Sequence, residues 1–360
     1  MQAINTILNQ KKNSILYGLP QTGISYFLKN HASVDLYLDF ADGDVYRKFV
    51  LNPDFLTVLL ADTITTVVLD HFIDIDPMVE VIRKVISKNQ KIHFIIVTQK
   101  HDIKKLKSLD FNLCFILPES SQSQDSNSGF ALSYYTYGHL NGVLYNPNPI
   151  LKLNDISGEL VKRCSLKNKT MTLLLLNLLA ADQERIVNFE KWSEELKLPS
   201  RTLREYYLRL VDEGYIYEIS DAGSTKRNKF YFLDVGLKNA YKNVLDVEDY
   251  DVNIEQNFED LIFLELLKYS FIHKKINISF LSNYKNQYLH FILNSKVSIC
   301  VKPTNFVHES FVHFQNKTHI KNNFSNSYFI SFDENQFQAD SVQFINYDTF
   351  LSLLWSHKLV

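Results

Sequence analysis

A short apolar run leads directly into the segment Gly18-Leu19-Pro20-Gln21-Thr22-Gly23-Ile24-Ser25. Both glycines, the closing serine and the helical pattern that follows match the phosphate-binding loop G-x-x-x-x-G-K-[ST]. In such a loop, backbone amides and the helix N-terminus hold phosphate oxygens, and the serine hydroxyl binds Mg²⁺. The spacing therefore predicts nucleotide contacts from Gly18, Gln21, Thr22, Gly23, Ile24 and Ser25.

Position 24 departs from this motif, because it holds isoleucine where the motif has lysine. The lysine bridges the β- and γ-phosphates and neutralises charge during transfer, and isoleucine can do neither. We therefore expect ATP and Mg²⁺ to bind only weakly. A second interpretation stays open, in which this is a strand–turn–helix whose glycines serve backbone geometry alone.

A second apolar run, 65–69, ends in Asp70 and His71. This is the Walker B pattern, in which Asp70 holds Mg²⁺ through water. A catalytic carboxylate usually comes next, and here His71 takes that place, where a neutral imidazole can act as a base. The run 92–97 ends at Thr98, which is placed to sense the γ-phosphate. We assign Asp70 and His71 as candidate catalytic residues, and Asp70 and Thr98 as further nucleotide contacts. Without the loop upstream, Asp70 would equally fit a buried strand that ends in a capping acid.

Short apolar runs alternate with helical patterns through the first part of the chain. Strands are expected at 14–17, 34–40, 65–69 and 92–97, and helices at 28–31, 45–60 and 77–88. This alternation predicts a parallel α/β sheet with both faces covered. The polar tract 119–129 that follows is predicted to be a loop.

After Pro147 and Pro149 the pattern changes. Consecutive helices are expected over 156–213, and a small β element at 215–219 and 230–233 around a turn at 221–228. The last part combines a helix at 256–269 with strands at 276–281, 288–293, 297–301 and 328–332. This mixture predicts an α+β domain.

Two of these helices, 189–196 and 201–212, flank a short turn and precede a basic segment. A helix–turn–helix inserts its second helix into the major groove of DNA, and basic residues of a wing reach phosphates. Nearby acids nearly balance the basic charge, and winged helices also bind proteins, so a protein partner stays open. The residues assigned to DNA contact are Ser200, Arg201, Arg204, Lys226, Arg227 and Lys229.

Further motifs support a family resemblance. They are an acidic second strand (Leu36-Tyr37-Leu38-Asp39), a glycine-containing segment (Tyr137-Gly138-His139-Leu140-Asn141-Gly142), the phrase Phe230-Tyr231-Phe232-Leu233-Asp234-Val235-Gly236-Leu237, and Phe258-Glu259-Asp260 with Glu265-Leu266. Taken in order, they resemble prokaryotic AAA-type ATPases whose C-terminal half joins a winged helix to a domain of unknown function with a restriction-nuclease-like fold. The resemblance covers nearly the whole chain. It implies an α/β P-loop parallel-sheet domain at 1–155, a helical winged-helix domain at 156–235 and an α+β restriction-endonuclease-like domain at 236–360.

The chain departs from that family in its last part. The family pattern has Asp on one strand and Glu-x-Lys on the next, whereas this chain has His290, then Cys300 and Lys302. A nuclease of this fold needs two carboxylates for Mg²⁺, and histidine with a thiol makes a softer site. We interpret these segments as core strands and assign no metal site.

Bulk properties narrow the function classes. The formal net charge of -2 gives no global basic field, so any nucleic-acid contact must be a local patch. Three cysteines without metal-ligand spacing fit a reducing compartment. The sequence shows no signal pattern and no apolar run of about 20 residues, the length that spans a bilayer. We expect a soluble, cytoplasmic protein without a membrane partner.

Ile24, His71, His290 and Cys300 each replace a residue that the family chemistry requires. The favoured hypothesis is an AAA-type ATPase-like protein with degenerate nucleotide and nuclease sites, acting as a binding or regulatory module with little or no ATP hydrolysis. One alternative is an active ATPase in which a displaced lysine, Lys11, Lys12 or Lys29, reaches the phosphates. Another is a DNA-binding regulator that acts through the winged helix. The partners considered are DNA, another protein and further copies of the chain.

Overall fold

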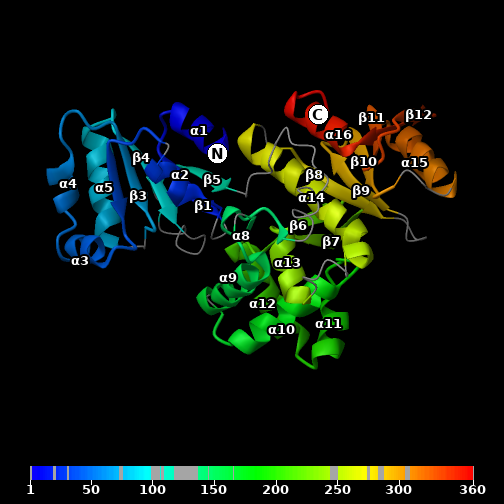
Figure 1. Ribbon diagram of the computed structural model, residues 1–360, viewed down its shortest axis with the longest axis horizontal. Coiled ribbons are helices and arrows are strands. Elements are labelled where there is room, and N and C mark those ends of the chain that lie inside the picture. The colour runs from blue at the N-terminus through cyan, green and yellow to red at the C-terminus, as the bar shows by residue number, and fades with distance from the viewer. Residues whose placement is uncertain are drawn as a thin grey trace. The chain divides into compact units, whose positions relative to one another are not determined.

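The computed structural model describes residues 2–18, 22–30, 32–72, 76–98, 106, 109–116, 137–144, 146–164, 166–243, 250–273, 276–282, 288–304 and 309–359. The chain divides into two compact units. The first comprises Met1–Glu119 with the short segments Leu140–Gly142 and Asp212–Gly214, and the second comprises the rest. Figure 1 labels the elements of each unit.

The first unit contains a five-stranded sheet in the order β2-β3-β4-β1-β5. Its strands are β1 (Ser14–Gly18), β2 (Leu36–Asp39), β3 (Thr66–Asp70), β4 (His93–Thr98) and β5 (Asn112–Ile116). All four pairings are parallel, which confirms the expected parallel α/β sheet. The edge strand β5 was not predicted, although four of its five residues are apolar.

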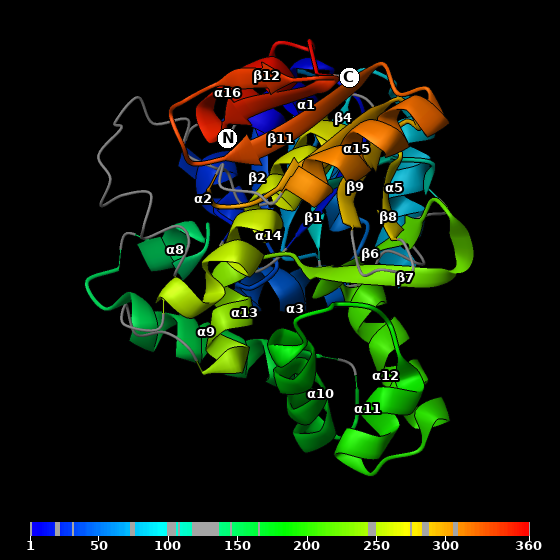
Figure 2. The same ribbon diagram turned by 90° about the vertical axis from the view of Figure 1, so that its right-hand side faces the viewer.

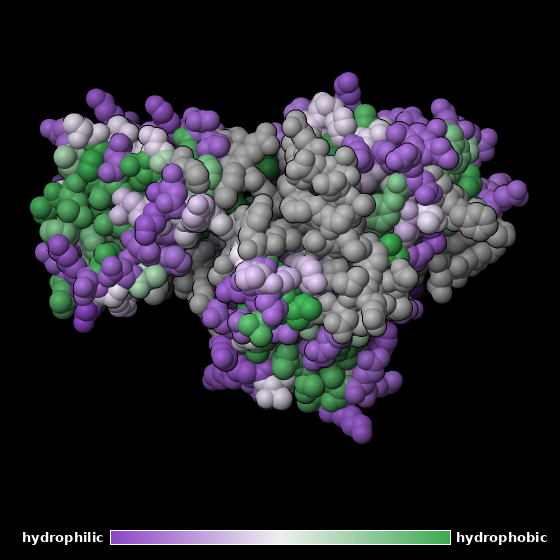
Figure 3. All heavy atoms as spheres, viewed as in Figure 1, coloured by the Kyte–Doolittle hydropathy of each residue, from purple (hydrophilic) through white to green (hydrophobic). Residues whose placement is uncertain are grey.

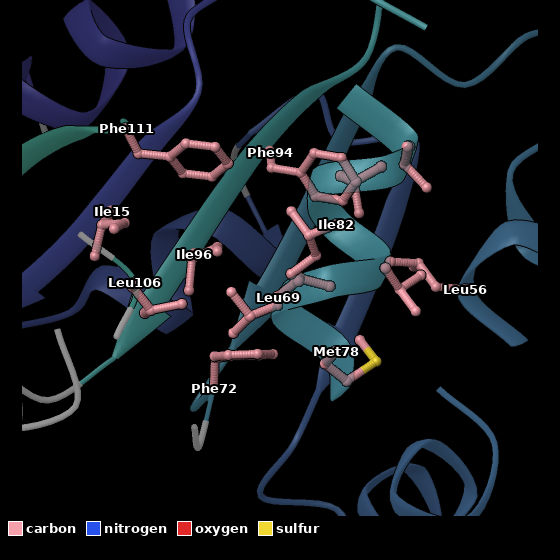
Figure 4. Close-up of a cluster of buried hydrophobic side chains, with 14 of the residues drawn as sticks. Ile15, Leu56, Leu69, Phe72, Met78, Ile82, Phe94, Ile96, Leu106 and Phe111 are labelled. Atoms are coloured by element: carbon pink, nitrogen blue, oxygen red, sulfur yellow. The ribbon is translucent and has the colours of Figure 1, made fainter. Parts of the chain in front are cut away.

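Helices cover both faces of this sheet. On one face lie α1 (Gln2–Asn9) and α2 (Ile24–Asn30), and on the other lie α3 (Gly43–Leu51), α4 (Phe55–Leu59) and α5 (Asp76–Lys88). Neighbouring strand residues point to opposite faces, so Val68 packs against α2 and Leu69 against α5. Figure 4 shows Met78 and Ile82 of α5 facing Leu69 and Ile96 of the sheet. This double burial explains the continuous apolar runs of the strands.

The single helix expected over 45–60 is wrong. The chain forms α3, capped by the side chain of Asp42, and then the separate helix α4. Pro53 lies between them, and a proline disfavours helical geometry in the residue before it. Helix α3 accordingly ends at Leu51, with Asn52 as its C-cap.

The second unit begins with helices. They are α9 (Pro149–Arg163), α10 (Lys169–Ala181), α11 (Phe189–Leu196), α12 (Ser200–Glu213), α13 (Val235–Lys242) and α14 (Tyr250–Ile272), while the short helix α8 (Asn141–Leu144) precedes them. Asparagine side chains cap α9, α10 and α11 by accepting a hydrogen bond from a first-turn amide. The start of α11 at Phe189 agrees with the prediction, whereas α9 begins at Pro149, before the expected 156.

The second unit also contains an eight-stranded sheet in the order β12-β13-β11-β10-β9-β8-β6-β7. Its strands are β6 (Ile216–Asp221), β7 (Ser224–Phe232), β8 (Ile278–Ser282), β9 (Tyr288–Leu293), β10 (Val297–Val301), β11 (Asn326–Ser331), β12 (Phe337–Ala339) and β13 (Val342–Asn346). Two further helices, α15 (Glu309–Asn322) and α16 (Tyr347–Trp355), accompany them. Figure 2 shows α15 lying against the C-terminal strands. The pattern did not predict α15, β12, β13 or α16.

The hairpin β6–β7 joins the C-terminal strands in one sheet, because Ser220 and Asp221 of β6 pair in parallel with Ser279 and Phe280 of β8. The boundary predicted between 235 and 236 therefore lies inside a unit whose sheet is continuous. The expected turn at 221–228 is mostly strand, since β7 already begins at Ser224. The division into three domains stays a prediction.

Exposed apolar side chains occur on α3 and α4. Leu51 and Val58 are among the most exposed large apolar residues that the structure describes, at 85% and 74%. Figure 3 shows hydrophobic residues gathered over the end of the first unit that carries these helices. Within the described residues, no helix combines the length and apolar character that crossing a membrane requires.

Candidate functional site

The predicted nucleotide residues lie at one edge of the first sheet, where its parallel strands end. Tyr17 pairs with Thr98, and Asp39 pairs with Asp70, so the carboxyl ends of four neighbouring strands are aligned. Ligands of open α/β sheets bind outside these ends. The topology therefore brings Gly18, Asp70 and Thr98 to the same edge, as the motifs imply.

The two loop glycines have geometric reasons to be glycine. A Cβ atom on Gly18 would stand 2.3 Å from the carbonyl oxygen of Ile116, at the end of β5. Gly23 has a φ of 86°, which only glycine adopts easily, and its carbonyl accepts from the amide of Phe27 as α2 begins. Thr22 is buried. Gln21 lies outside the described residues.

Ile24 packs into the apolar core. Its side chain is 6% exposed and belongs to the cluster formed by α1, α2 and the sheet. Its neighbours in that cluster include Leu16, Val68 and Ile116. The side chain at the lysine position therefore contributes to packing between helix and sheet. It offers neither charge nor hydrogen-bond donor to a phosphate.

Asp70 is completely buried and accepts hydrogen bonds from neutral donors. The Ser25 hydroxyl donates to Oδ1 at 3.1 Å, and the backbone amide of His71 donates to the same oxygen at 2.8 Å. The Tyr37 hydroxyl donates to Oδ2. Burial and the Asp70 carboxylate raise the pKa of Tyr37, so the hydroxyl stays protonated. Sequence reasoning assigned no role to Tyr37. Its position two residues before Asp39 on a strand was the available signal.

His71 turns its imidazole toward a second carboxylate. Its Nδ1 lies 2.9 Å from Oδ1 of Asp39 and 3.7 Å from Oδ1 of Asp70. The residue has a φ of 49°, a left-handed conformation that is uncommon for residues other than glycine but that histidine adopts more often than most. The imidazole is 52% exposed. His71 is thus held beside two acids at an edge that solvent reaches.

Thr98 uses its hydroxyl within the sheet edge. The hydroxyl donates to the carbonyl oxygen of Phe72 at 2.7 Å, and the amide of Phe72 donates to the carbonyl of Val97. Thr98 is buried. In this arrangement it fixes the segment that follows β3, and its hydroxyl proton is not directed to a ligand.

Two of the three lysines considered as replacements lie at the wrong end of the sheet. Lys11 and Lys12 precede β1, and the charge of Lys11 contributes to lowering the pKa of His93 at the start of β4, although burial is the larger cause. The full length of β1 therefore separates both lysines from Gly18. Lys29 is exposed in the last turn of α2. Ser25 and Asp70 supply oxygens suited to Mg²⁺, but among the described residues no lysine occupies the position of the phosphate-binding cation, which Ile24 holds.

The predicted DNA-contact residues fall into two groups. Arg201 and Arg204 are exposed on α12, which begins at Ser200, and the guanidinium of Arg204 lies over the ring of Phe189. Arg227 is exposed on β7, and one of its guanidinium nitrogens lies 3.4 Å from the Ser282 hydroxyl. Lys226 is on the same strand, and its side chain lies outside what the structure describes.

Lys229 does not belong with these residues. It is 6% exposed, and its ammonium lies 2.5 Å from Oε1 of Glu259. The same oxygen accepts from the Tyr231 hydroxyl at 2.6 Å, and Arg185 lies 3.8 Å from Oε2. Lys229 and Arg185 lower the pKa of Glu259, overcoming burial, so this carboxylate is charged. The assignment of Lys229 to DNA contact is wrong, because β7 turns this residue into the interior.

Two of the motifs that carried the family resemblance contact each other in the second unit. Asp234 caps α13 by accepting from the amide of Leu237, and it also accepts from the amide of His139 at 2.9 Å. A Cβ on Gly236 would stand 2.1 Å from the carbonyl oxygen of Tyr137. The glycine-containing segment thus docks on the start of α13, and both sequences serve packing at this contact.

The positions that correspond to the nuclease pattern do not form an acidic site. Cys300 is completely buried in an apolar cluster, and burial raises the pKa of its thiol. His290 Nδ1 accepts from the amide of Val301 at 3.2 Å, and burial lowers the pKa of its imidazole to about 4. Lys302 lies 3.6 Å from Glu255. His290 is therefore neutral near pH 7.

Comparisons with known proteins leave the family unassigned. No protein-family model matches the chain, and no curated protein matches it. Among solved structures, the chain is similar to the Aeropyrum pernix Orc1 protein in complex with DNA. The match has 14% identity and a TM-score of 0.29, and covers 68% of this chain and 88% of that one. A TM-score of this size does not support an argument about fold or function.

Proposed function

We propose that this chain is an AAA-type ATPase-like protein that acts as a binding or regulatory module with little or no ATP hydrolysis. The observation that carries the proposal is the burial of Ile24 among Leu16, Val68 and Ile116. The two glycines keep the backbone geometry of the loop, while the position that should neutralise phosphate is committed to the core. Losing one charge-assisted contact of this kind costs about 1.5–3 kcal/mol of binding.

The second group required for hydrolysis is also altered. A water-activating carboxylate is replaced by His71, whose Nδ1 lies against Asp39. The Asp39 carboxylate orients this imidazole through Nδ1, but a histidine is not the carboxylate that the Walker B motif places at this position. Burial of Cys300 likewise removes the second metal-binding position of the nuclease pattern.

The test is a calorimetric titration of the purified chain with Mg²⁺·ATP, followed by measurement of phosphate release. We expect weak binding or none, and phosphate release equal to that of the Asp70→Asn variant. Asparagine keeps the shape and one oxygen of the side chain, so it removes charge with little loss of volume. Turnover above this control, at micromolar affinity, would overturn the proposal in favour of a working ATPase with Lys29 as the displaced cation.

A second candidate function is DNA binding through α12. The specific observation is that Arg201 and Arg204 are exposed on the second helix of the pair α11–α12, beside the hairpin β6–β7. An isolated antiparallel bridge joins Ile186 to Lys229 of this hairpin, where a winged helix would place its third short strand. Phosphate contacts by these arginines would make binding fall steeply with salt.

Duplex binding, measured by fluorescence anisotropy across a salt series, tests this candidate. Arg201→Ala is the cleaner variant, because Arg204 also lies over the Phe189 ring and its loss alters packing. We expect Arg201→Ala to reduce the salt slope by about 1. Arg47→Ala, which removes an exposed arginine of the first unit, is the matched control. Equal slopes for both variants would exclude α12 as the DNA-contacting helix.

A further inference from the structure

Three side chains at the end of β2 and β3 form a group with the composition of a transition-metal site. One oxygen of Asp39, one oxygen of Asp70 and one ring nitrogen of His71 all lie within 4.8 Å of one another. They come from two adjacent strands whose register places Asp39 directly beside Asp70. We propose that Asp39, Asp70 and His71 directly coordinate a divalent transition-metal ion, with Zn²⁺ as the reference ion, independently of any nucleotide.

The spacing of the three atoms fits one small cation. Ligands roughly 2.0–2.2 Å from zinc stand roughly 3.3–3.6 Å apart across a tetrahedral angle. The separations from His71 Nδ1 are 2.9 Å to Oδ1 of Asp39 and 3.7 Å to Oδ1 of Asp70, which lie on either side of that range. Shifts of a few tenths of an ångström, within the freedom of side-chain torsions, would bring both to tetrahedral spacing.

Charge provides a second argument. The carboxylates of Asp39 and Asp70 lie side by side at the ends of their strands, and Asp70 is completely buried. Among the described residues, the ion pairs recorded for either acid involve only His71. The other donors to Asp70 are the neutral hydroxyls of Ser25 and Tyr37 and a backbone amide. A divalent cation would compensate this negative charge, because buried charges are stable when paired or metal-bound.

Hydrogen bonds around the three side chains hold them as the outer contacts of a metal site hold its ligands. The Tyr37 hydroxyl and the His71 amide fix the Asp70 carboxylate, and such outer contacts orient a ligand and tune its basicity. The left-handed backbone at His71 turns the imidazole back onto the two acids.

The donor set selects the class of ion. Imidazole favours zinc, copper, iron and nickel, whereas Mg²⁺ prefers an all-oxygen shell and keeps its waters. Replacement of the expected catalytic acid by His71 would therefore convert a site for water-mediated Mg²⁺ into one for direct binding of a softer ion. With three protein ligands, at least one coordination position stays open to solvent or substrate.

The experiment is a titration of the chelator-stripped full chain with Zn²⁺ alone, against a chromophoric competitor. The key variant is His71→Asn, because asparagine tolerates the left-handed backbone and removes the imidazole. The matched control is His313→Ala, which removes an exposed histidine on α15. We expect one equivalent to bind the parent chain and the control. Affinity should fall at least about 10–100-fold in His71→Asn, the range measured for losing even an outer-shell partner.

A Tyr37→Phe variant and a Co²⁺ spectrum test the proposed ligands in two further ways. Tyr37→Phe leaves all three ligands in place, so we expect about 10–100-fold weaker Zn²⁺ binding from the loss of its hydrogen bond alone. Titration with Co²⁺ should give visible bands of a nitrogen–oxygen site, without thiolate charge transfer. Equal Zn²⁺ affinity for the parent chain and His71→Asn, or a thiolate band, would overturn the proposal. The titration contains no ATP, so its failure leaves the proposed pseudo-ATPase function intact.

Discussion

Replacing Ile24 with lysine tests the central inference about the loop. The side chain is 6% exposed and belongs to a cluster with residues of α1, α2 and the four strands β1, β3, β4 and β5. Truncating such an isoleucine to alanine costs about 2–5 kcal/mol. A lysine keeps part of the apolar contact through its stem, but its ammonium must reach solvent or stay buried. We expect Ile24→Lys to destabilise the first unit by about 2–4 kcal/mol.

The control for this variant is Ile24→Met, which has a similar unbranched stem and no charge. Volume-conserving exchanges of this type cost less than about 1.5 kcal/mol. Calorimetric unfolding should separate the two variants, because 1 kcal/mol shifts the midpoint by roughly 4 °C in a unit of this size. The expected loss in Ile24→Lys is then about 8–16 °C, and clearly less in Ile24→Met.

Nucleotide binding by the same variants completes the test. If position 24 belongs to the core, Mg²⁺·ATP affinity should be the same for Ile24→Lys and Ile24→Met. The reasoning is refuted if the lysine variant is as stable as the methionine variant and also binds at least tenfold more tightly. A tenfold gain is about 1.4 kcal/mol, and it would mean that the side chain faces the phosphates.

Three other predictions concern the second unit. Lys229→Met leaves its glutamate partner charged and buried, so we expect the free energy of unfolding, measured by chemical denaturation, to fall by about 3–5 kcal/mol. An unchanged denaturation midpoint would contradict the buried ion pair. Burial raises the pKa of Asp234 to about 6, above its ordinary value of 3.8, so its contribution grows as pH falls from 6 to 4. His290 has a pKa of about 4 instead of 6.5, so its contribution to the free energy of unfolding falls over a similar pH range. The loss of folding stability on acidification should therefore be steeper in Asp234→Asn. In His290→Gln, stability should instead rise over this range. Gly236→Ala should destabilise by more than about 1 kcal/mol because its Cβ meets backbone at 2.1 Å, while Gly158→Ala, with open space in α9, should stabilise by about 0.5–1 kcal/mol.

Much of the first unit could be predicted from its sequence, because its signals are local. Apolar runs buried on both faces mark β1, β3 and β4, and the spacing of Gly18 and Gly23 marks the turn between β1 and α2. The same pattern missed β5, although four of its five residues are apolar. It also joined α3 to α4, since helical periodicity continued across Pro53.

The candidate site was only partly predictable. Asp70 and His71 stood out because an acid ends an apolar strand. That His71 reaches Asp39, 32 residues earlier, depends on the strand register and on the backbone turn after β3. Neither is encoded in residue spacing, because register arises from packing of whole strands.

The sequence by itself determined which side chains were present and in what order: a loop without its lysine, an acid followed by histidine, and basic residues on a helix and a hairpin. Tertiary structure alone decided which of them are buried and which side chains they contact. Ile24 and Lys229 both belong to motifs that suggest contact with phosphate, yet packing buries one in an apolar core and the other beside Glu259. The physical reason is that a side chain's partner depends on residues far away in sequence, and burial makes that partner obligatory.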